Sequence, residues 1–411
     1  MPGLWRRTDF RLLWAGQTVS QLGEHTALTI LPLLAVLTLD AGADQLGLLR
    51  AAGQAPQLLL ALFAGVWVDR WRTRTVMVCS DLGRAVALAV TGAAAVSGTL
   101  GLPALLAVTV VVGALSVFFD IAYQASLTRL VERDLLLPAG SAIEASRSAA
   151  QIAGPAVGGA VASLPFAPAA VAVAFLASLA AIAPIREAAP PAPAVRPHIR
   201  AGLRFVAGDG ALRAICAASG AFQFFLAATM TGYLLFLPRE LGLSATAIGL
   251  TLAAVGPGAL AGSLLAARLP RRLGHGPVLV GAAVIGNGAM LAVPALHGSS
   301  AGTLAALVAV NLVSGTFGQL VNVTVIAVRQ ALTPDALQGR VAATIMFAGM
   351  GLTPFGSLFG GLLADRWTLR AALLICTAGM MLSPAIMLVS PLARLGRTVP
   401  ARAARPAGSR P

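Results

Sequence analysis

The chain has 411 residues, of which 57% are hydrophobic and only 11% are charged. A soluble protein needs more charge to cover its surface, so this composition excludes an ordinary soluble enzyme and indicates helices surrounded by lipid. The net charge of +14 comes from arginines that stand in short segments between apolar runs, a distribution that argues against nucleic-acid binding.

Twelve apolar runs follow one another along the chain, each long enough to cross a bilayer as a helix. They are expected near residues 12–37, 47–68, 75–97, 103–127, 140–163 and 166–184, then 211–238, 247–268, 276–297, 303–328, 341–364 and 369–390. The sequence therefore predicts an all-α membrane protein with one six-helix bundle in residues 1–184 and a second in residues 211–391. Residues 185–210 are expected to be a cytoplasmic linker with an amphipathic helix, and residues 392–411 a basic tail.

The arginines are divided unevenly between the two sides of these spans. With the N-terminus inside, 23 of the 29 lie in cytoplasmic segments, four (Arg50, Arg239, Arg366 and Arg370) lie in outer segments, and Arg84 and Arg147 lie within spans. Because positive residues favour the cytoplasmic side, both termini are predicted to be cytoplasmic. We expect a monomeric multi-pass protein of a bacterial cell membrane, with the lipid bilayer as its surroundings.

The fifth predicted span contains Gly154-Pro155 followed by Gly158-Gly159. The eleventh contains a related pattern, Thr353-Pro354-Phe355-Gly356 followed by Gly360-Gly361. Glycine lets membrane helices approach closely, and proline bends them. Such a repeat is typical of transporters whose two halves rock around a central site.

Ionisable residues within spans are concentrated in the first half. They are Glu24, Asp81 with Arg84, Asp120, and Glu144 with Arg147, whereas the second half offers mainly amides and hydroxyls. The two pairs with a spacing of three residues can be structural ion pairs. Glu24 has only His25 as a local ionisable neighbour, and a buried carboxylate of this kind can carry a proton. We therefore take Glu24 as the first candidate for proton coupling, with Asp81 and Glu144 as the next.

No constellation for catalysis or cofactor binding is visible. Cys79, Cys216 and Cys376 stand far apart in apolar runs and fit no metal-ligand spacing. There is no phosphate-binding loop and no nucleophile arrangement. The sequence predicts no metal, no cofactor and no enzyme, and leaves an ion gradient as the source of energy.

The segment between the second and third spans contains Gly65, Asp69, Arg70, Arg72 and Arg74. It resembles the signature loop of the major facilitator superfamily, in which an aspartate and arginines latch the cytoplasmic ends of the two halves. The resemblance implies the same role here, with Asp120 as a carboxylate partner. One position departs from the family pattern, because Arg72-Thr73 stands where a glycine-arginine pair is usual.

Four further stretches, 10–24, 80–85, 119–125 and 200–206, resemble drug:proton antiporters related to macrolide and enterobactin exporters. The Gly154-Pro155 run is similar to the helix motif that antiporters of this superfamily share. The resemblance implies the major facilitator fold and proton-coupled efflux of small amphipathic or hydrophobic compounds, such as a drug, a siderophore or a secondary metabolite. A transporter of one polar nutrient or metabolite and a membrane sensor without transport are the alternatives.

Overall fold

A computed structural model of the chain describes residues 2–68, 70–132, 135–164, 166–185, 199–334 and 337–397, and all regular elements in these ranges are helices. The expected tail and most of the linker lie outside them. The first half contains α1 (Pro2–Trp5), α2 (Thr8–Leu37), α3 (Ala43–Val68), α4 (Thr73–Val96), α5 (Leu102–Leu130), α6 (Leu136–Val161) and α7 (Ala167–Ile182).

The second half contains more and shorter helices. They are α8 (Ile199–Gly208), α9 (Gly210–Arg239), α10 (Ala245–Ala253), α11 (Val255–Ala266), α12 (Leu269–Leu273), α13 (His275–Ala289), η2 (Met290–Ala295), α14 (Ala301–Leu332), α15 (Gln338–Met350), α16 (Thr353–Arg366), α17 (Leu369–Met380), α18 (Leu382–Val389) and η4 (Pro391–Arg394). Four of these spans are interrupted just before Pro257, Pro294, Pro354 or Pro384. Each proline lacks the N–H that would bond to the carbonyl of the preceding turn, so the helix breaks there.

Eight described segments are long and apolar enough to cross a membrane. They are Thr73–Val96, Leu102–Leu127, Gly210–Arg239, Ala245–Ala266, His275–Ala295, Ala301–Leu332, Gln338–Arg366 and Leu369–Val389. Helix α7 is apolar but shorter, with 16 residues. Helices α2, α3 and α6 have 30, 26 and 26 residues, more than the roughly 20 that a bilayer requires, and α2 carries a series of polar side chains. The fold is that of an all-helical membrane protein.

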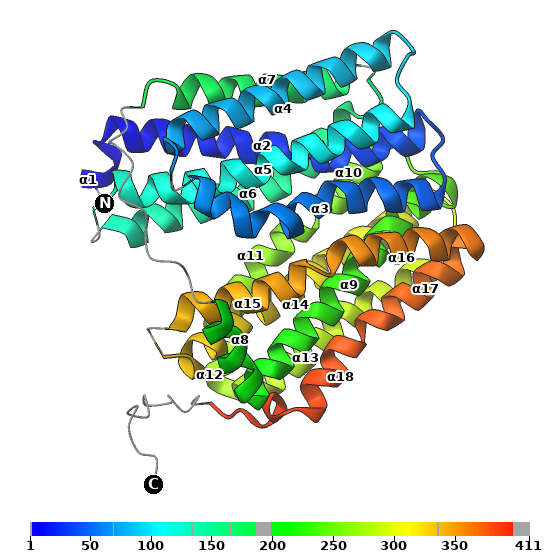
Figure 1. Cartoon of the computed structure of the whole chain (residues 1–411). Helices are drawn as coiled ribbons and strands as arrows, with labels where there is room; N and C mark the ends of the chain where they lie inside the picture. Colours follow the sequence, from blue (N-terminus) through cyan, green and yellow to red (C-terminus); the bar gives the residue numbers. More distant parts are fainter. Residues whose placement is uncertain are drawn as a thin grey trace.

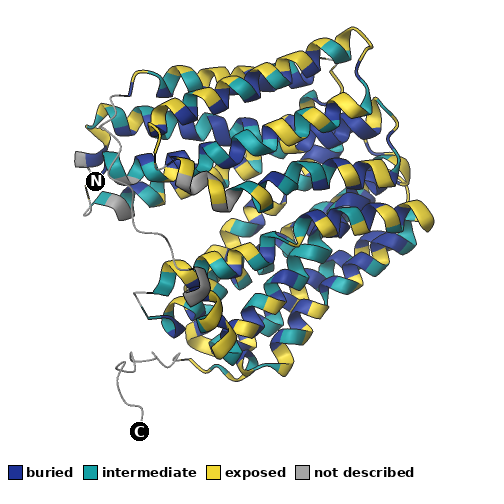
Figure 2. Ribbon diagram, viewed as in Figure 1, coloured by how far each residue is buried: buried dark blue, intermediate teal, exposed yellow. Residues whose placement is uncertain are grey.

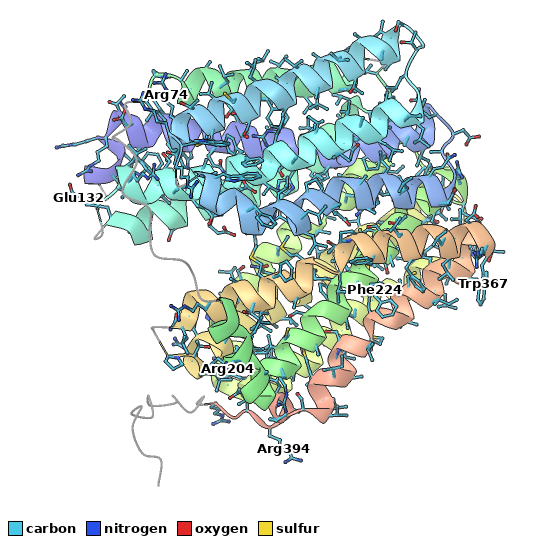
Figure 3. The ribbon with its side chains drawn as sticks, viewed as in Figure 1. Arg74, Glu132, Arg204, Phe224, Trp367 and Arg394 are labelled. Carbon is cyan, nitrogen blue, oxygen red and sulfur yellow. The ribbon has the colours of Figure 1, made fainter. Side chains whose placement is uncertain are left out.

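Helices α2 to α7 pack mainly against one another, and so do α9 to α18. The two bundles diverge at the end that holds α1 and η4, and they meet at the opposite end (Figure 1). We call these the terminal end and the far end. Arg74, Glu132, Arg204 and Arg394 lie at the terminal end, and Trp367 lies at the far end (Figure 3).

The buried apolar side chains follow the same division. One cluster joins both halves near the far end and includes Leu34 and Leu46 together with Phe236 and Ile248. Three further clusters each belong to one half. Figure 2 shows buried residues where the bundles meet. The apolar cluster shared by both halves therefore lies near the far end, and toward the terminal end the two bundles diverge (Figure 1).

Close backbone contacts seal the far end. In α3 and α16, a Cβ added to Gly361 would lie 2.8 Å from the Cα of Gly47. In α6 and α10, a Cβ added to Gly159 would lie 2.5 Å from the Cα of Gly249. Arg239 adds an ion pair across the halves, 2.8 Å from Asp40.

Short polar side chains start the helices that begin at the far end of the second bundle. Ser244, Ser300 and Thr368 precede α10, α14 and α17, and the hydroxyl of each accepts a hydrogen bond from a backbone N–H of the first turn. Such caps satisfy donors that the helix itself leaves free. They fix where these spans begin.

Helix α8 is the described part of the expected amphipathic linker helix. Gly202 and Val206 are buried, whereas Leu203 and Arg204 are exposed. A Cβ added to Gly202 would lie 2.7 Å from the carbonyl oxygen of Arg340, so α8 packs directly against α15. Helix α8 is therefore amphipathic, and its buried face packs against the second bundle.

Candidate functional site

Arg84, on α4, is the centre of a polar cluster inside the first bundle. Its side chain is 0% exposed. Its Nη2 donates to Asp81 Oδ1 at 2.5 Å and to Ser20 Oγ at 3.0 Å, and its Nη1 donates to Ser116 Oγ at 3.2 Å. The expected Asp81–Arg84 pair is thus part of a network that ties α4 to α2 and α5.

Two aromatic rings enclose the guanidinium of Arg84. Its Cζ lies 4.6 Å from the ring centre of Phe119 and 4.4 Å from that of Phe175, which belong to α5 and α7. The faces of aromatic rings attract a cation, and these rings also exclude water from the Asp81 pair. The charge of Arg84 is therefore held in a fixed position within the membrane.

Glu24, on α2, faces this cluster from another helix. Its Oε2 lies 3.7 Å from Arg84 Nη1, and its side chain is 20% exposed, in contrast to the fully buried Asp81. Leu28 stands one turn further along the same face of α2 and is 60% exposed. The prediction that Glu24 is isolated was wrong, because Arg84 comes from another helix.

Asp120 lies in the interior of α5 and not at a helix end. Its Oδ1 accepts a hydrogen bond from Gln21 Nε2 at 3.4 Å, and the charged groups that influence it are Glu24, Arg84 and Arg147. The expectation that Asp120 pairs with the arginines of the loop is therefore corrected. Asp120 stands about ten residues before the end of α5, a rise of roughly 15 Å, which places it in the Arg84 cluster.

Glu144 and Arg147 form an ion pair on α6. Arg147 Nη2 lies 2.6 Å from Glu144 Oε1, and a second bond joins Nε to Oε2 at 3.0 Å. Both side chains are about half exposed, and Arg147 lies within electrostatic range of His25 and Asp120.

The signature loop is only partly described. Asp69 and the surroundings of Gly65 lie outside the described residues. Arg70 and Arg72 are exposed and line a surface cavity of about 710 Å³ together with Trp71. Arg74 also lies at the terminal end (Figure 3).

The glycines of α6 have two different neighbours. A Cβ on Gly154 would lie 2.4 Å from His25 Cβ, and one on Gly158 would lie 3.0 Å from Thr29 Cβ, both on α2. Gly159 instead contacts α10 of the other half, while the carbonyl of Pro155 faces Gly249. The motif thus packs α6 against its own bundle and against the opposite bundle at once.

The second half repeats this arrangement. Gly356 and Gly360 pack against the backbone of α9, and Gly361 packs against α3 of the first half. These glycines match Gly154, Gly158 and Gly159 at one constant offset in the sequence. The prolines do not match, because Ser357 occupies the position equivalent to Pro155. The Ser357 hydroxyl donates instead to Gln54 Oε1 on α3 at 3.0 Å.

The sequence matches the family of transmembrane secretion effectors over residues 4–405. The chain belongs to this family. The match confirms the resemblance to the major facilitator superfamily, and it makes the chain a transporter rather than an enzyme. No curated protein matches the sequence.

Solved structures of other transporters share the fold of this secretion effector. A bacterial homologue of the human lysosomal transporter Spinster, inward-facing and occupied, has a TM-score of 0.76 at 14% identity and covers 94% of this chain and 96% of its own. An inward-facing bacterial homologue of the iron transporter ferroportin has 0.74 at 16%, covering 92% and 98%. The nucleoside transporter NupG has 0.72 at 13%, covering 93% and 98%.

Sequence reasoning about this secretion effector missed five members of the Arg84 cluster: Ser20, Gln21, Ser116, Phe119 and Phe175. Ser20 and Gln21 stand one turn before Glu24 on α2, so helical spacing could have placed them beside it. Phe175 carries no such signal, because it belongs to an apolar helix that approaches only in the folded bundle.

Proposed function

We propose that this secretion effector is a proton-coupled exporter of small amphipathic or hydrophobic molecules that works by alternating access. The observation that carries the proposal is the position of Glu24. We infer that the diverging bundles enclose a cleft at the terminal end. Glu24 is 20% exposed on the face of α2 that carries the exposed Leu28, and it faces the buried Arg84. A drug, a siderophore or a secondary metabolite would suit the apolar cleft.

The charges around the cleft favour proton binding. Four carboxylates (Glu24, Asp81, Asp120 and Glu144) accompany two arginines (Arg84 and Arg147). An ionised carboxylate without a counter-charge is expensive within a membrane, and taking up a proton removes that cost. Glu24 is the first candidate because its Oε2 has no hydrogen-bond partner among the described residues and its side chain is 20% exposed, whereas Asp81, whose Oδ2 is also without a partner, is fully buried.

The proton and the structure can be linked through Arg84. Ionised Glu24 is attracted to the fixed guanidinium, and protonated Glu24 is not. The packing of α2 beside Gly154 and Gly158 therefore depends on the charge of Glu24. We infer that protonation biases the equilibrium between the two open states of the cleft, as a coupled carrier requires.

The experiment that tests this proposal is efflux from proteoliposomes with and without an imposed pH gradient. The uncharged dye Nile red and the anionic dye 1-anilinonaphthalene-8-sulfonate serve as the amphipathic probes. Glu24→Gln imitates the protonated form, so uphill efflux should stop while dye binding persists. Glu24→Asp should retain part of the activity, and Asp44→Asn, on the exposed start of α3, is the matched control. Gradient-driven efflux by Glu24→Gln at the original rate would place coupling at Asp81 or Glu144.

We further propose twelve spans with both termini cytoplasmic, arranged as bundles in residues 1–184 and 211–391 in a bacterial cell membrane. The arginine distribution supports this orientation, which would make the open terminal end the cytoplasmic one. The length of α2, α3 and α6 supports the count. The protein is expected to act as a monomer.

Cysteine labelling should report this topology. In a background without Cys79, Cys216 and Cys376, a cysteine that replaces exposed Thr99 or Ser299 should react with an impermeant maleimide added to intact cells. One that replaces exposed Arg204 or Arg272 should react only after the membrane is opened. The reverse pattern would overturn the orientation. If the two positions of one pair, Thr99 and Ser299 or Arg204 and Arg272, reacted from opposite sides of the membrane, the predicted number of spans would be wrong.

A further inference from the structure

Arg50 lies within the membrane-spanning part of α3, although the sequence placed it in an outer segment. It stands seven residues after the start of the helix at Ala43, a rise of roughly 10 Å. Arg50 is half-buried, and it precedes Gln54, whose amide oxygen accepts the bond from Ser357 of the second half. Arg50 therefore lies near the closed far end of the cleft.

Arg50 lacks a polar partner. Its Nε is buried without a hydrogen bond, and no carboxylate of the described residues pairs with it or lies within electrostatic range. The guanidinium keeps its charge under all ordinary conditions. A half-buried guanidinium whose Nε is shielded from water and that has no counter-charge among the described residues is unfavourable, and an anion beside it would remove part of that cost.

The neighbours of Arg50 on α3 form a polar stripe. Arg50, Gln54 and Gln57 follow the spacing i, i+4, i+7, which puts their side chains on one helix face, and all three are half-buried. The lipid-facing side of α3 is marked by the exposed Leu59 and Phe63. The polar stripe points away from that side and toward the interior of the protein.

The stripe and the proton-binding cluster lie at different depths. Glu24 stands thirteen residues before the end of α2, roughly 20 Å from the far end, whereas Arg50 stands roughly 10 Å from it. Exposed Leu28 lies between these levels. The cleft thus offers a positive group at its closed end, then apolar surface, then carboxylates.

We propose that Arg50 binds an anionic group of the transported molecule, so that the substrates of this exporter are amphipathic organic anions. The planar guanidinium matches a carboxylate, sulfonate or phosphate with two parallel hydrogen bonds, and the amides of Gln54 and Gln57 can add donors. The apolar body of the molecule lies along the Leu28 side of the cleft. This inference rests on the proposed efflux function and specifies its substrate class.

The test measures binding to the purified protein in detergent, without any gradient. The probes are matched pairs of an anion and its uncharged amide: benzoate and benzamide, 1-naphthoate and 1-naphthamide, decanoate and decanamide. Dissociation constants come from titration calorimetry. The wild type should bind at least one anion tenfold or more tightly than its amide. Arg50→Gln should lose that preference, Arg50→Lys should retain part of it, and Arg204→Gln, at an exposed position of α8, should retain all of it.

Three outcomes would overturn the proposal. The wild type could show no preference for any anion, Arg50→Gln could keep the preference, or chloride alone could bind with heat that Arg50→Gln abolishes. If Arg50→Gln does not fold, the proposal is tested by the anion preference of the wild type and by whether Arg50→Lys reduces it. Because no proton gradient is involved, failure of proton coupling in proteoliposomes would leave this result standing, and the converse also holds.

Discussion

Replacing Arg84 with methionine should destabilise the protein by about 3–5 kcal/mol, since it leaves the fully buried Asp81 without its counter-charge. The two phenylalanine rings would also lose the cation that they enclose. Methionine fills a similar apolar volume, so the loss of charge is the main change. The measurement is the free energy of unfolding in mixed micelles, by denaturant titration.

The double variant Asp81→Asn, Arg84→Met separates charge from packing. Removing both charges should recover much of the lost stability, because the large penalty belongs to the unpaired carboxylate. The control is Arg147→Met, whose pair with Glu144 is about half exposed and should contribute about 1 kcal/mol or less. Equal losses in Arg84→Met and Arg147→Met would show that the Arg84 cluster is not an electrostatic centre.

Gly159→Ala should shift the equilibrium toward a state that is open at the far end. The added Cβ would lie 2.5 Å from Gly249 Cα and 2.6 Å from the carbonyl oxygen of Ala245, which are backbone atoms that cannot yield cheaply. Overpacking of this kind costs about 1–3 kcal/mol, equivalent to a change of about 5- to 150-fold between two states. Only the state with the far end closed should bear this cost.

The readout is the reaction rate of a reporter cysteine at position 54 with a maleimide added from the far side. Gln54 is a suitable position because its side chain takes part in the contact between α3 and α16, where its Oε1 accepts the hydrogen bond from Ser357. Gly140→Ala is the matched control in the same helix, since a Cβ there meets nothing within 4 Å. Unchanged labelling in Gly159→Ala, at levels equal to Gly140→Ala, would mean that the contact between α6 and α10 does not gate the cleft.

The all-helical architecture could be predicted from the sequence because a long apolar run in lipid has only one stable backbone structure in a chain of this kind. Each run must satisfy its backbone internally, so each becomes a helix. A repeated glycine pattern is also visible without coordinates, because a glycine permits close helix packing through its own lack of a side chain. The pattern is Gly154, Gly158 and Gly159 in one half and Gly356, Gly360 and Gly361 in the other. The breaks before Pro257 and Pro384 follow from local chemistry in the same way.

The partners of charged residues depend on other helices. Glu24 was predicted to be isolated because His25 is its only ionisable neighbour in the sequence, yet Arg84 of α4 lies 3.7 Å away. Asp120 was assigned to the loop arginines by its order along the chain, and the bundle places it beside Gln21 instead. The sequence of one span does not reveal how that span is rotated about its axis relative to its neighbours. That rotation decides which side chains of different helices meet.

The sequence by itself determined that this protein is a membrane protein of helical spans, which residues inside those spans are charged, and which glycines permit close packing. Those properties follow from the cost of polar groups in hydrocarbon, which acts on each segment separately. Only the tertiary structure decided that Arg84 meets Asp81 and Glu24, that Arg50 has no ion pair among the described residues, and that the two halves pack backbone to backbone at the far end. Those features arise from contacts between segments distant in the chain, where packing and charge must be satisfied together.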